Sequence, residues 1–400
     1  MLDVWPAFPI VVSCHNTNSS SPLRGVLNVI AALKCYDRVC EIDLSGTPHY
    51  LLKRFAALTI PFPALTSLQL HSDEDWPLIL PSSFLGGFAP RLRSLWLSGI
   101  PFPAPRNLFL SCTGLATLRM ENIPHTGCIS PEDMATCLSA LVKVEEVTLG
   151  FRRALLYDVL PWHQTSSNQH SPTCAVLPAL TSLRFRGDCW YFEALISQMD
   201  VPLLNNFDIS FFDLTLSHTP LLRELISRIE TFKGLHRAKL AFQDFVADIT
   251  LSRQEQPADC KTLKLGIACR GPAQQLSSMT QICNSSLPPL STLRHLYILD
   301  SYSLTGLLDE MDNARWLGLL LPFTSVENLH LSYKQAPYVT RALQALPGER
   351  IVQVLPALRT IFLHRPPLSG TDPEVPGRFI AARQRFGRPV SVHYTDGIGW

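Results

Sequence analysis

Six basic residues in the middle of the chain alternate with apolar residues, and they are the first candidates for chemistry. An arginine can hold a carboxylate or a phosphate through two parallel hydrogen bonds, while a lysine supplies a compact positive charge. If the six residues lie on one face of a sheet, that face would recognise an acidic or phosphorylated protein segment. Glu121, Glu146 and Asp208 interrupt the series, so an ordinary solvated face with internal ion pairs is the alternative. The six residues are Arg119, Arg184, Arg186, Arg237, Lys239 and Lys264.

A second group, nearer the C-terminus, is aromatic and rich in histidine. Such surfaces suit contacts with proteins. Three histidines on separate strands could also hold a metal, but no carboxylate or cysteine spacing supports that interpretation, so no metal or cofactor is expected. The residues expected to bind a partner are His295, Tyr297, His330 and Phe362, with Asn328 and His364 beside them.

Motifs of known enzyme classes are missing from the sequence. It contains no G-x-S-x-G, H-E-x-x-H, P-loop or G-x-G-x-x-G pattern. The histidines also do not pair with cysteine or serine at the spacing of a known motif. We therefore expect no catalytic residues and a protein that is not an enzyme.

The elements that position these residues are indicated by a recurring motif. Pro63-Ala64-Leu65-Thr66-Ser67-Leu68 returns unchanged as 178–183, and a close variant spans 356–361. The core L-x-x-L-x-L is the strand signature of a leucine-rich repeat. Apolar triplets of this type recur about twelve times, at intervals of roughly 23 to 36 residues, which leaves room for a helix in most units. Such units stack because one alone cannot bury its apolar face.

The predicted fold is α/β, a leucine-rich-repeat solenoid (horseshoe) of about twelve irregular repeats, with a parallel sheet on the concave face. Residues 1–22 would form an N-terminal extension or cap, 23–365 the solenoid, and 366–400 a C-terminal cap. The strand-like run 247–251 is expected on the convex side in place of a helix. Residues 152–173 form a long insertion with a polar end. Helices are predicted over 23–36, 188–199, 220–229, 275–283, 311–321, 338–346 and 379–385, one more begins at Ser130-Pro131, and the end strand spans 389–392.

Composition narrows the class of protein. The chain is 46% hydrophobic and 17% charged with a net charge of +1, so it is ordered and no global charge favours nucleic acid or a membrane. The 11 cysteines form no C-x-x-C pair, and several lie in apolar segments, such as Cys35, Cys137 and Cys283. This pattern predicts a reduced protein of the cytoplasm or nucleus. Neither a signal peptide nor a transmembrane segment is expected.

As a set, several segments resemble the leucine-rich-repeat part of fungal (basidiomycete-type) F-box-like proteins. The resemblance covers essentially the whole chain. The segments that carry it are Leu2-Asp3-Val4-Trp5-Pro6-Ala7-Phe8-Pro9, Asp37-Arg38-Val39-Cys40-Glu41-Ile42, Phe62-Pro63-Ala64-Leu65-Thr66-Ser67-Leu68, Ser83-Phe84-Leu85-Gly86-Gly87, Ala89-Pro90-Arg91-Leu92-Arg93-Ser94-Leu95, Cys137-Leu138-Ser139-Ala140-Leu141, Ser285-Ser286-Leu287-Pro288-Pro289-Leu290-Ser291-Thr292-Leu293 and Gly348-Glu349-Arg350.

The resemblance implies a non-enzymatic protein–protein interaction module, the substrate-recognition part of an F-box receptor of a cullin–RING (SCF-type) ubiquitin ligase. No F-box module is seen, and Met1 falls where the repeat region of the family begins. The ligase adaptor is therefore expected as a partner only if an F-box is encoded upstream. The alternative is an F-box-less gene fragment or structural repeat protein without a ligase role. Nucleic-acid binding would require a continuous basic strip.

Overall fold

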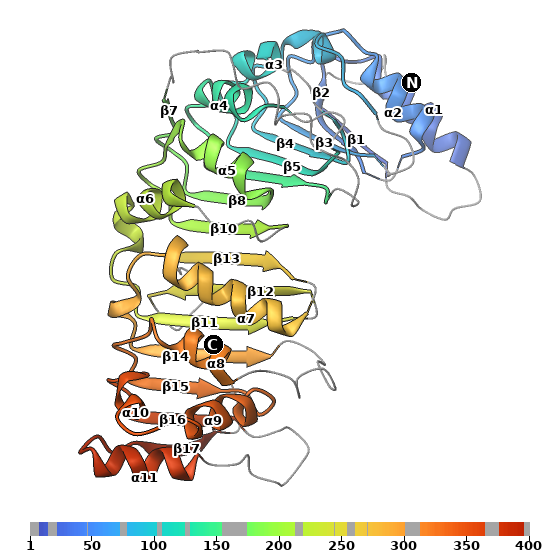
Figure 1. Cartoon of the computed structure of the whole chain (residues 1–400). Helices are drawn as coiled ribbons and strands as arrows, with labels where there is room; N and C mark the ends of the chain where they lie inside the picture. The colour runs from blue at the N-terminus through green and yellow to red at the C-terminus, as the bar shows by residue number, and fades with distance from the viewer. Residues whose placement is uncertain are drawn as a thin grey trace. The chain divides into compact units, whose positions relative to one another are not determined.

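The computed structural model describes residues 8–14, 22–45, 47–72, 78–101, 106–124, 129–153, 174–212, 219–243, 245–253, 261–269, 271–300, 313–364 and 376–395. The chain packs as two compact units, Met1–Leu204 and Asn205–Trp400, which are treated separately below. Each unit is mixed α/β and dominated by parallel strands (Figure 1). No described helix is long and apolar enough to cross a bilayer.

The first unit contains a parallel sheet in which the strands follow one another in chain order. A separate pair of short parallel strands, β7 and β9, lies outside that sheet. The strands are β1 (Ile10–Ser13), β2 (Val39–Leu44), β3 (Ser67–His71), β4 (Ser94–Ser98), β5 (Thr117–Ile123), β6 (Glu146–Phe151), β7 (Ala175–Val176), β8 (Ser182–Gly187) and β9 (Met199–Asp200). The helices are α1 (Pro22–Leu33), α2 (His49–Ala56), the 3₁₀ turn η1 (Phe84–Gly87), α3 (Arg106–Ser111), α4 (Pro131–Ser139) and α5 (Cys189–Ile196).

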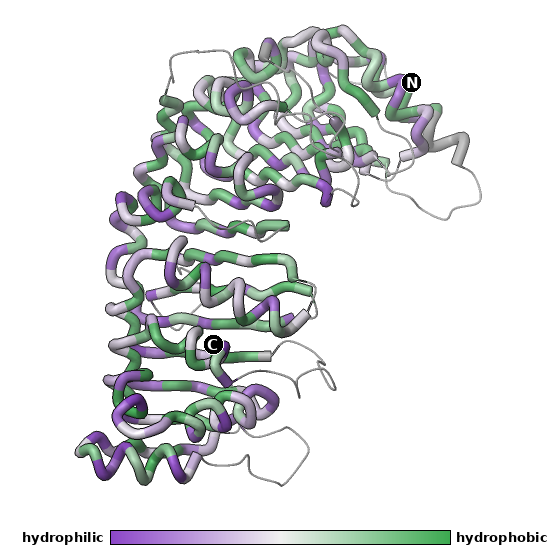
Figure 2. Tube along the Cα trace, viewed as in Figure 1, coloured by the Kyte–Doolittle hydropathy of each residue, from purple (hydrophilic) through white to green (hydrophobic). Residues whose placement is uncertain are grey.

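The apolar triplets form the core as predicted. In β3, Leu68 and Leu70 alternate with exposed or half-buried residues, and Leu65 packs just before the strand; all three are 0% exposed. The same alternation recurs in the other strands, and Figure 2 shows hydrophobic residues returning along them. Burying a leucine side chain stabilises the fold by about 1.5–3 kcal/mol. Each repeat therefore depends on the neighbouring repeats to cover its row of leucines.

Helix α4 begins as its sequence predicts. The Ser130 hydroxyl accepts a 3.0 Å hydrogen bond from the backbone N–H of Asp133, and Pro131 occupies the first turn. Glu132 and Asp133 place negative charge at the positive end of the helix dipole. The helices predicted near 188, 220, 275 and 338 are also present, with ends shifted by a few residues.

The second unit holds strands β10 (Asn206–Phe211), β11 (Arg237–Phe242), β12 (Val246–Ser252), β13 (Thr262–Ala268), β14 (His295–Asp300), β15 (Asn328–Leu331), β16 (Thr360–His364) and β17 (Ser391–Thr395). Its helices are α6 (Pro220–Arg228), η4 (Glu230–Phe232), α7 (Pro272–Gln281), the π-helical turn η6 (Ile282–Ser286), η7 (Leu290–Thr292), α8 (Asn313–Leu320), α9 (Ala336–Gln344), α10 (Arg350–Gln353) and α11 (Gly377–Arg385). The strand order is β10-β13-β12-β11-β14-β15-β16-β17.

This order corrects the expectation of a simple parallel succession. The run 247–251 does not replace a helix on the convex side; it belongs to β12, which lies inside the sheet and pairs antiparallel with both β11 and β13. The physical cause is the short 243–245 connection, closed by a 2.8 Å hydrogen bond from the N–H of Gln243 to the carbonyl of Val246. A parallel neighbour would require a crossover of a dozen or more residues.

The two ends of the chain both contribute strands. β1, within the predicted extension, pairs with β2, and β17 pairs with β16. Helix α11 is anchored by Arg383, which is 0% exposed and donates hydrogen bonds to backbone carbonyls, including that of Leu358 at 3.0 Å. Burial lowers the pKa of this guanidinium, and nearby Arg388 acts in the same direction. The predicted insertion 152–173 lies almost wholly outside the described residues.

The described cysteines are free thiols. Cys137 and Cys283 are buried as expected, whereas Cys35 is only half-buried. Burial raises the pKa of the thiol at Cys112 to about 11 and at Cys189 to about 12. These two groups are therefore protonated at neutral pH and poor nucleophiles.

Candidate functional site

The side chains that alternate with the buried triplets form what we call the open face of each sheet. In the first unit Arg119, Arg184 and Arg186 lie on this face and are exposed, as the strand register predicts. Arg119 is engaged by a neighbour, because its Nη2 lies 3.5 Å from Oε2 of Glu146. This pair matches the ion-paired, solvated face that the sequence left open as the alternative.

The open face of the second unit is organised differently. Its central row runs across every strand of that sheet, because each of its members faces the next in the strand register. The row begins with charged and polar residues and continues with rings. In spatial order it is Asp208, Lys264, Thr250, Lys239, Tyr297, His330, Phe362 and His393.

The ring half of this row, Tyr297, His330, Phe362 and His393, is called the ring ladder below. The centroids of Tyr297 and His330 are 4.1 Å apart with 12° between the planes. His330 and Phe362 are 4.4 Å apart at 7°, and Phe362 and His393 are 5.6 Å apart at 28°. Offset stacking of this kind stabilises the rings beyond their burial. The ladder therefore offers a rigid apolar surface at low cost in side-chain entropy.

Arg237 and Tyr297 are more buried than exposed binding residues would be. Arg237 is 8% exposed and Tyr297 4%. The guanidinium carbon of Arg237 lies 5.8 Å from the centroid of the Tyr297 ring, a cation–π geometry. The physical reason for their burial is the close spacing of side chains on adjacent strands, which makes Tyr297 one layer of the stack. The neighbouring His295 lies 3.4 Å, Nδ1 to Nδ2, from Asn328.

The charged half of the row surrounds a buried carboxyl. Asp248 on β12 is 4% exposed, and Lys239 and Lys264 lie on the two strands that flank it. Burial raises the pKa of Asp248, Lys264 and Lys239 oppose that rise, and Asp208 adds to it. Thr250 separates the two lysines in the register, since it faces Lys239 on β11 and Lys264 on β13. The charged half of the row thus places Lys239 and Lys264 beside two carboxyl groups, Asp208 and Asp248, and Lys239 is the member that faces the ring ladder.

His330 is held neutral. Burial first, and then the like charges of His364, His295 and Arg237, lower the pKa of His330 to about 3. The ring centroids of His295 and His364 lie 6.2 and 6.0 Å from that of His330. Within the described residues no group of three or more His, Cys, Asp or Glu side chains is placed to hold a metal ion.

The open face of the second unit contains three residues that the sequence analysis did not identify: Asp248, Thr250 and His393. Asp248 and Thr250 were missed because β12 was placed outside the main sheet. The alternation of Ala247, Ile249 and Leu251 was the available signal, since all three prove buried while Asp248 and Thr250 occupy the other face. His393 was missed because the end strand was placed too early, at 389–392 instead of Ser391–Thr395.

Comparisons with known proteins place the chain in no family. No protein-family model matches it, and no curated protein matches it. Among solved structures, it is similar to the leucine-rich repeat-containing protein LegL7 from Legionella pneumophila, with 12% sequence identity and a TM-score of 0.33. That match covers 89% of this chain and 90% of the other.

Proposed function

We propose that this protein is a non-enzymatic protein-interaction module whose second unit binds an extended acidic or phosphorylated segment of a partner protein. The observation that carries the proposal is the central row of the open face. There Lys239 faces Tyr297, the first of the stacked rings, and Lys264 lies two strands further along the same row. The fold that presents the row is, on this proposal, the leucine-rich-repeat horseshoe of about twelve repeats that the triplets predict.

The two halves of the row match two parts of one ligand. Charge-assisted hydrogen bonds from the lysines would hold a carboxylate or phosphate. The half-buried rings of His330 and Phe362 and the exposed ring of His393 would pack against an apolar or aromatic side chain a few residues away. Arg237, which is 8% exposed and lies beside the Tyr297 ring, would hold that ring in place instead of contacting the ligand.

In the experiment, the protein selects binding peptides from a displayed library of extended acidic sequences, with and without phosphoserine. The affinity of each selected peptide is then measured for the unmodified protein and its variants at 50 and 200 mM salt. We expect Lys239→Glu with Lys264→Glu to weaken binding by at least about tenfold, since each charged hydrogen bond contributes about 1.5–3 kcal/mol. Equal binding by the double variant would overturn the proposal.

A matched control is Arg184→Glu with Arg186→Glu, on the open face of the first unit. Unchanged binding places the peptide on the second unit alone, whereas a loss shows that the predicted residues Arg119, Arg184 and Arg186 also take part. Nucleic acid is not the expected ligand. It would be indicated by a steep decline in binding of a labelled duplex between the two salt concentrations.

A finer role follows from the family resemblance. We propose that the bound segment belongs to a substrate recruited for ubiquitin transfer in the cytoplasm or nucleus. Co-purification with the cullin–RING ligase adaptor, using the complete reading frame, tests this role. Peptide binding without adaptor association would favour the alternative, a structural repeat protein with no ligase role.

A further inference from the structure

Two adjoining cavities lie at the edge of the second unit, away from the open face. One has a volume of about 430 Å³ and the other about 320 Å³, both within the range of small-ligand sites. Helix α6 and turn η4 form one wall, and the Ser285–Leu293 connection forms the other. The cavities share Ser227, Pro288 and Pro289, so they form one bipartite pocket.

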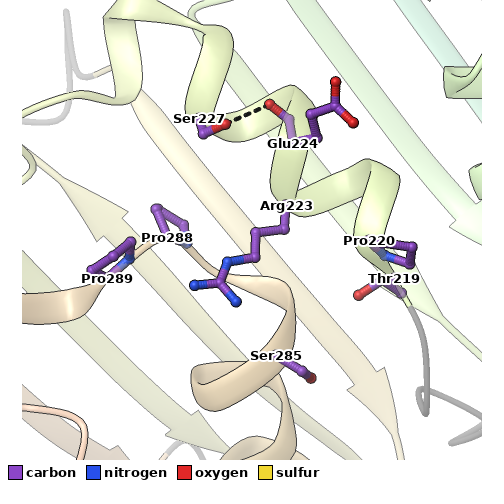
Figure 3. A pocket seen from close by; sticks show the side chains of 8 residues that line it. All are labelled: Thr219, Pro220, Arg223, Glu224, Ser227, Ser285, Pro288 and Pro289. Atoms are coloured by element: carbon purple, nitrogen blue, oxygen red, sulfur yellow. Dashed lines mark hydrogen bonds between the residues drawn. The ribbon is translucent and has the colours of Figure 1, made fainter.

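The larger cavity is the polar half. Figure 3 shows the side chain of Arg223 extending from α6 toward Ser285 and Pro288, across the space between the walls. Glu224 also lines this cavity, but in Figure 3 its carboxylate points away from Arg223, and its Oε1 lies 4.0 Å from Nε of Arg228. Arg223 is the basic residue among those that line this cavity. A planar guanidinium in this position suits a carboxylate.

The smaller cavity is the apolar half. Six of its lining residues are hydrophobic and are each at most 4% exposed. Lys233 lies at its border and pairs with Glu230, so its charge is already compensated. The six are Ile226, Phe232, Leu235, Leu251, Leu290 and Leu293.

The pocket arises from the inverted strand order. The chain must pass from β10 over two strands to β11, and later from β13 over two strands to β14. These two connections travel along the same stretch of sheet, and they carry α6–η4 and η6–η7. The walls are held together at one end by a 2.6 Å hydrogen bond from the Thr219 hydroxyl to Ser286, both buried. Between the walls a gap remains.

We infer that this pocket binds a small amphipathic carboxylate, with the carboxylate on Arg223 and the apolar part in the chamber lined by Phe232 and Leu290. Two sources share this chemistry: a short fatty acid, and the carboxy-terminal residue of a peptide with an aliphatic side chain. The inference is independent of the proposed function, since no pocket residue belongs to the open face.

The test is calorimetric titration of the full chain with octanoate and with N-acetylleucine, at constant ionic strength and up to about 1 mM. Octanamide and N-acetylleucinamide are the uncharged counterparts. We expect at least one carboxylate to bind and its amide to bind at least about tenfold more weakly. Binding of octanoate alone indicates a lipid-like ligand, and binding of N-acetylleucine alone indicates a peptide terminus.

Two variants assign the binding to this pocket. Arg223→Met keeps the length of an exposed side chain and removes its charge, so it should weaken carboxylate binding about tenfold. Ser227→Trp fills the junction of the two cavities and should abolish binding of the carboxylate and the amide. Arg228→Met, on the same helix but outside the pocket, is the matched control and should bind as the unmodified chain does.

Three results would each overturn the inference: no heat of binding from either carboxylate, equal affinity for carboxylate and amide, or unchanged affinity in Arg223→Met. Lys239→Glu with Lys264→Glu separates this site from the open face, because the double variant should bind octanoate normally. Loss of octanoate binding in that variant would likewise contradict the pocket assignment.

Discussion

The two units use the same apolar triplet to make strands and differ in what they place on top of them. The first unit keeps its strands in chain order and covers its open face with solvated charges, such as the Arg119–Glu146 pair. The second inverts three strands and carries a row of stacked rings that begins beside Lys239. The triplet therefore specifies a strand and its buried face, but it leaves the order of strands and the chemistry of the open face undetermined.

The largest effect is expected from Thr250→Pro in β12. Thr250 pairs with Lys239 on one side and Lys264 on the other, so a proline removes a ladder hydrogen bond inside the sheet. We expect a loss of about 3 kcal/mol or more in the free energy of unfolding, measured by urea denaturation. Thr250→Val should be tolerated, because a β-branched residue suits the strand. A harmless proline would mean that β12 is not an interior strand.

Removing one layer of the ring ladder should have the next largest effect. Phe362 stacks on His330 and His393, so Phe362→Ala loses two ring contacts and exposes the neighbours. We expect a cost of about 2 kcal/mol in urea denaturation, combining lost burial with lost stacking. His71→Ala, at an exposed strand position of the first unit, should cost no more than about 0.5 kcal/mol. Similar costs for the two variants would remove the distinction between the faces.

The neutral ring of His330 makes stability depend on pH. The folded-state pKa of about 3 lies below the ordinary value of 6.5, so the unfolded chain binds the proton more readily. Stability should therefore fall as the pH drops below 6.5. From pH 7 to 5 the loss should be about 1 kcal/mol, after allowance for the partial exposure of the ring. His330→Phe preserves the stack and should flatten this part of the stability profile; an unchanged profile would show that another group is responsible.

The smallest effect is expected at the ion pair of the first unit. A double-mutant cycle with Arg119→Met and Glu146→Gln should give a coupling of about 0.2–1 kcal/mol, since both side chains are about half exposed. The coupling should shrink as salt is raised from 0.1 to 1 M. A coupling well above 1 kcal/mol that resists salt would show that this face is also built around a specific interaction.

Much of the fold follows from the sequence because strand periodicity is a local property. Leu65, Leu68 and Leu70 predict their own burial, and Ser130-Pro131 predicts the start of α4. The position of β12 in the sheet could not be predicted from its own residues. The strands it pairs with depend on the length of the connection before it and on strands that are distant in the sequence. The register also placed Tyr297, His330 and Phe362 on one face, as the structure has them, but their role in binding stays a prediction. The stacking that buries Tyr297 could not be predicted, because it depends on three separate strands.

The inversion of β11, β12 and β13 has a consequence for how the chain can be assembled and altered. In a regular solenoid each repeat docks on the one before it, so repeats can be added or removed singly and folding can spread one unit at a time. Here β10 pairs with β13, and β11 and β12 lie between these two strands in the sequence. The residues that pair are therefore further apart in the chain than in a regular solenoid. The segment from Asn206 to Ala268 should therefore form as one cooperative block. A deletion that removes β11 alone would leave β12 without one of its two neighbours and break the sheet, whereas excision of β15 with its following helix would remove a single stacked layer.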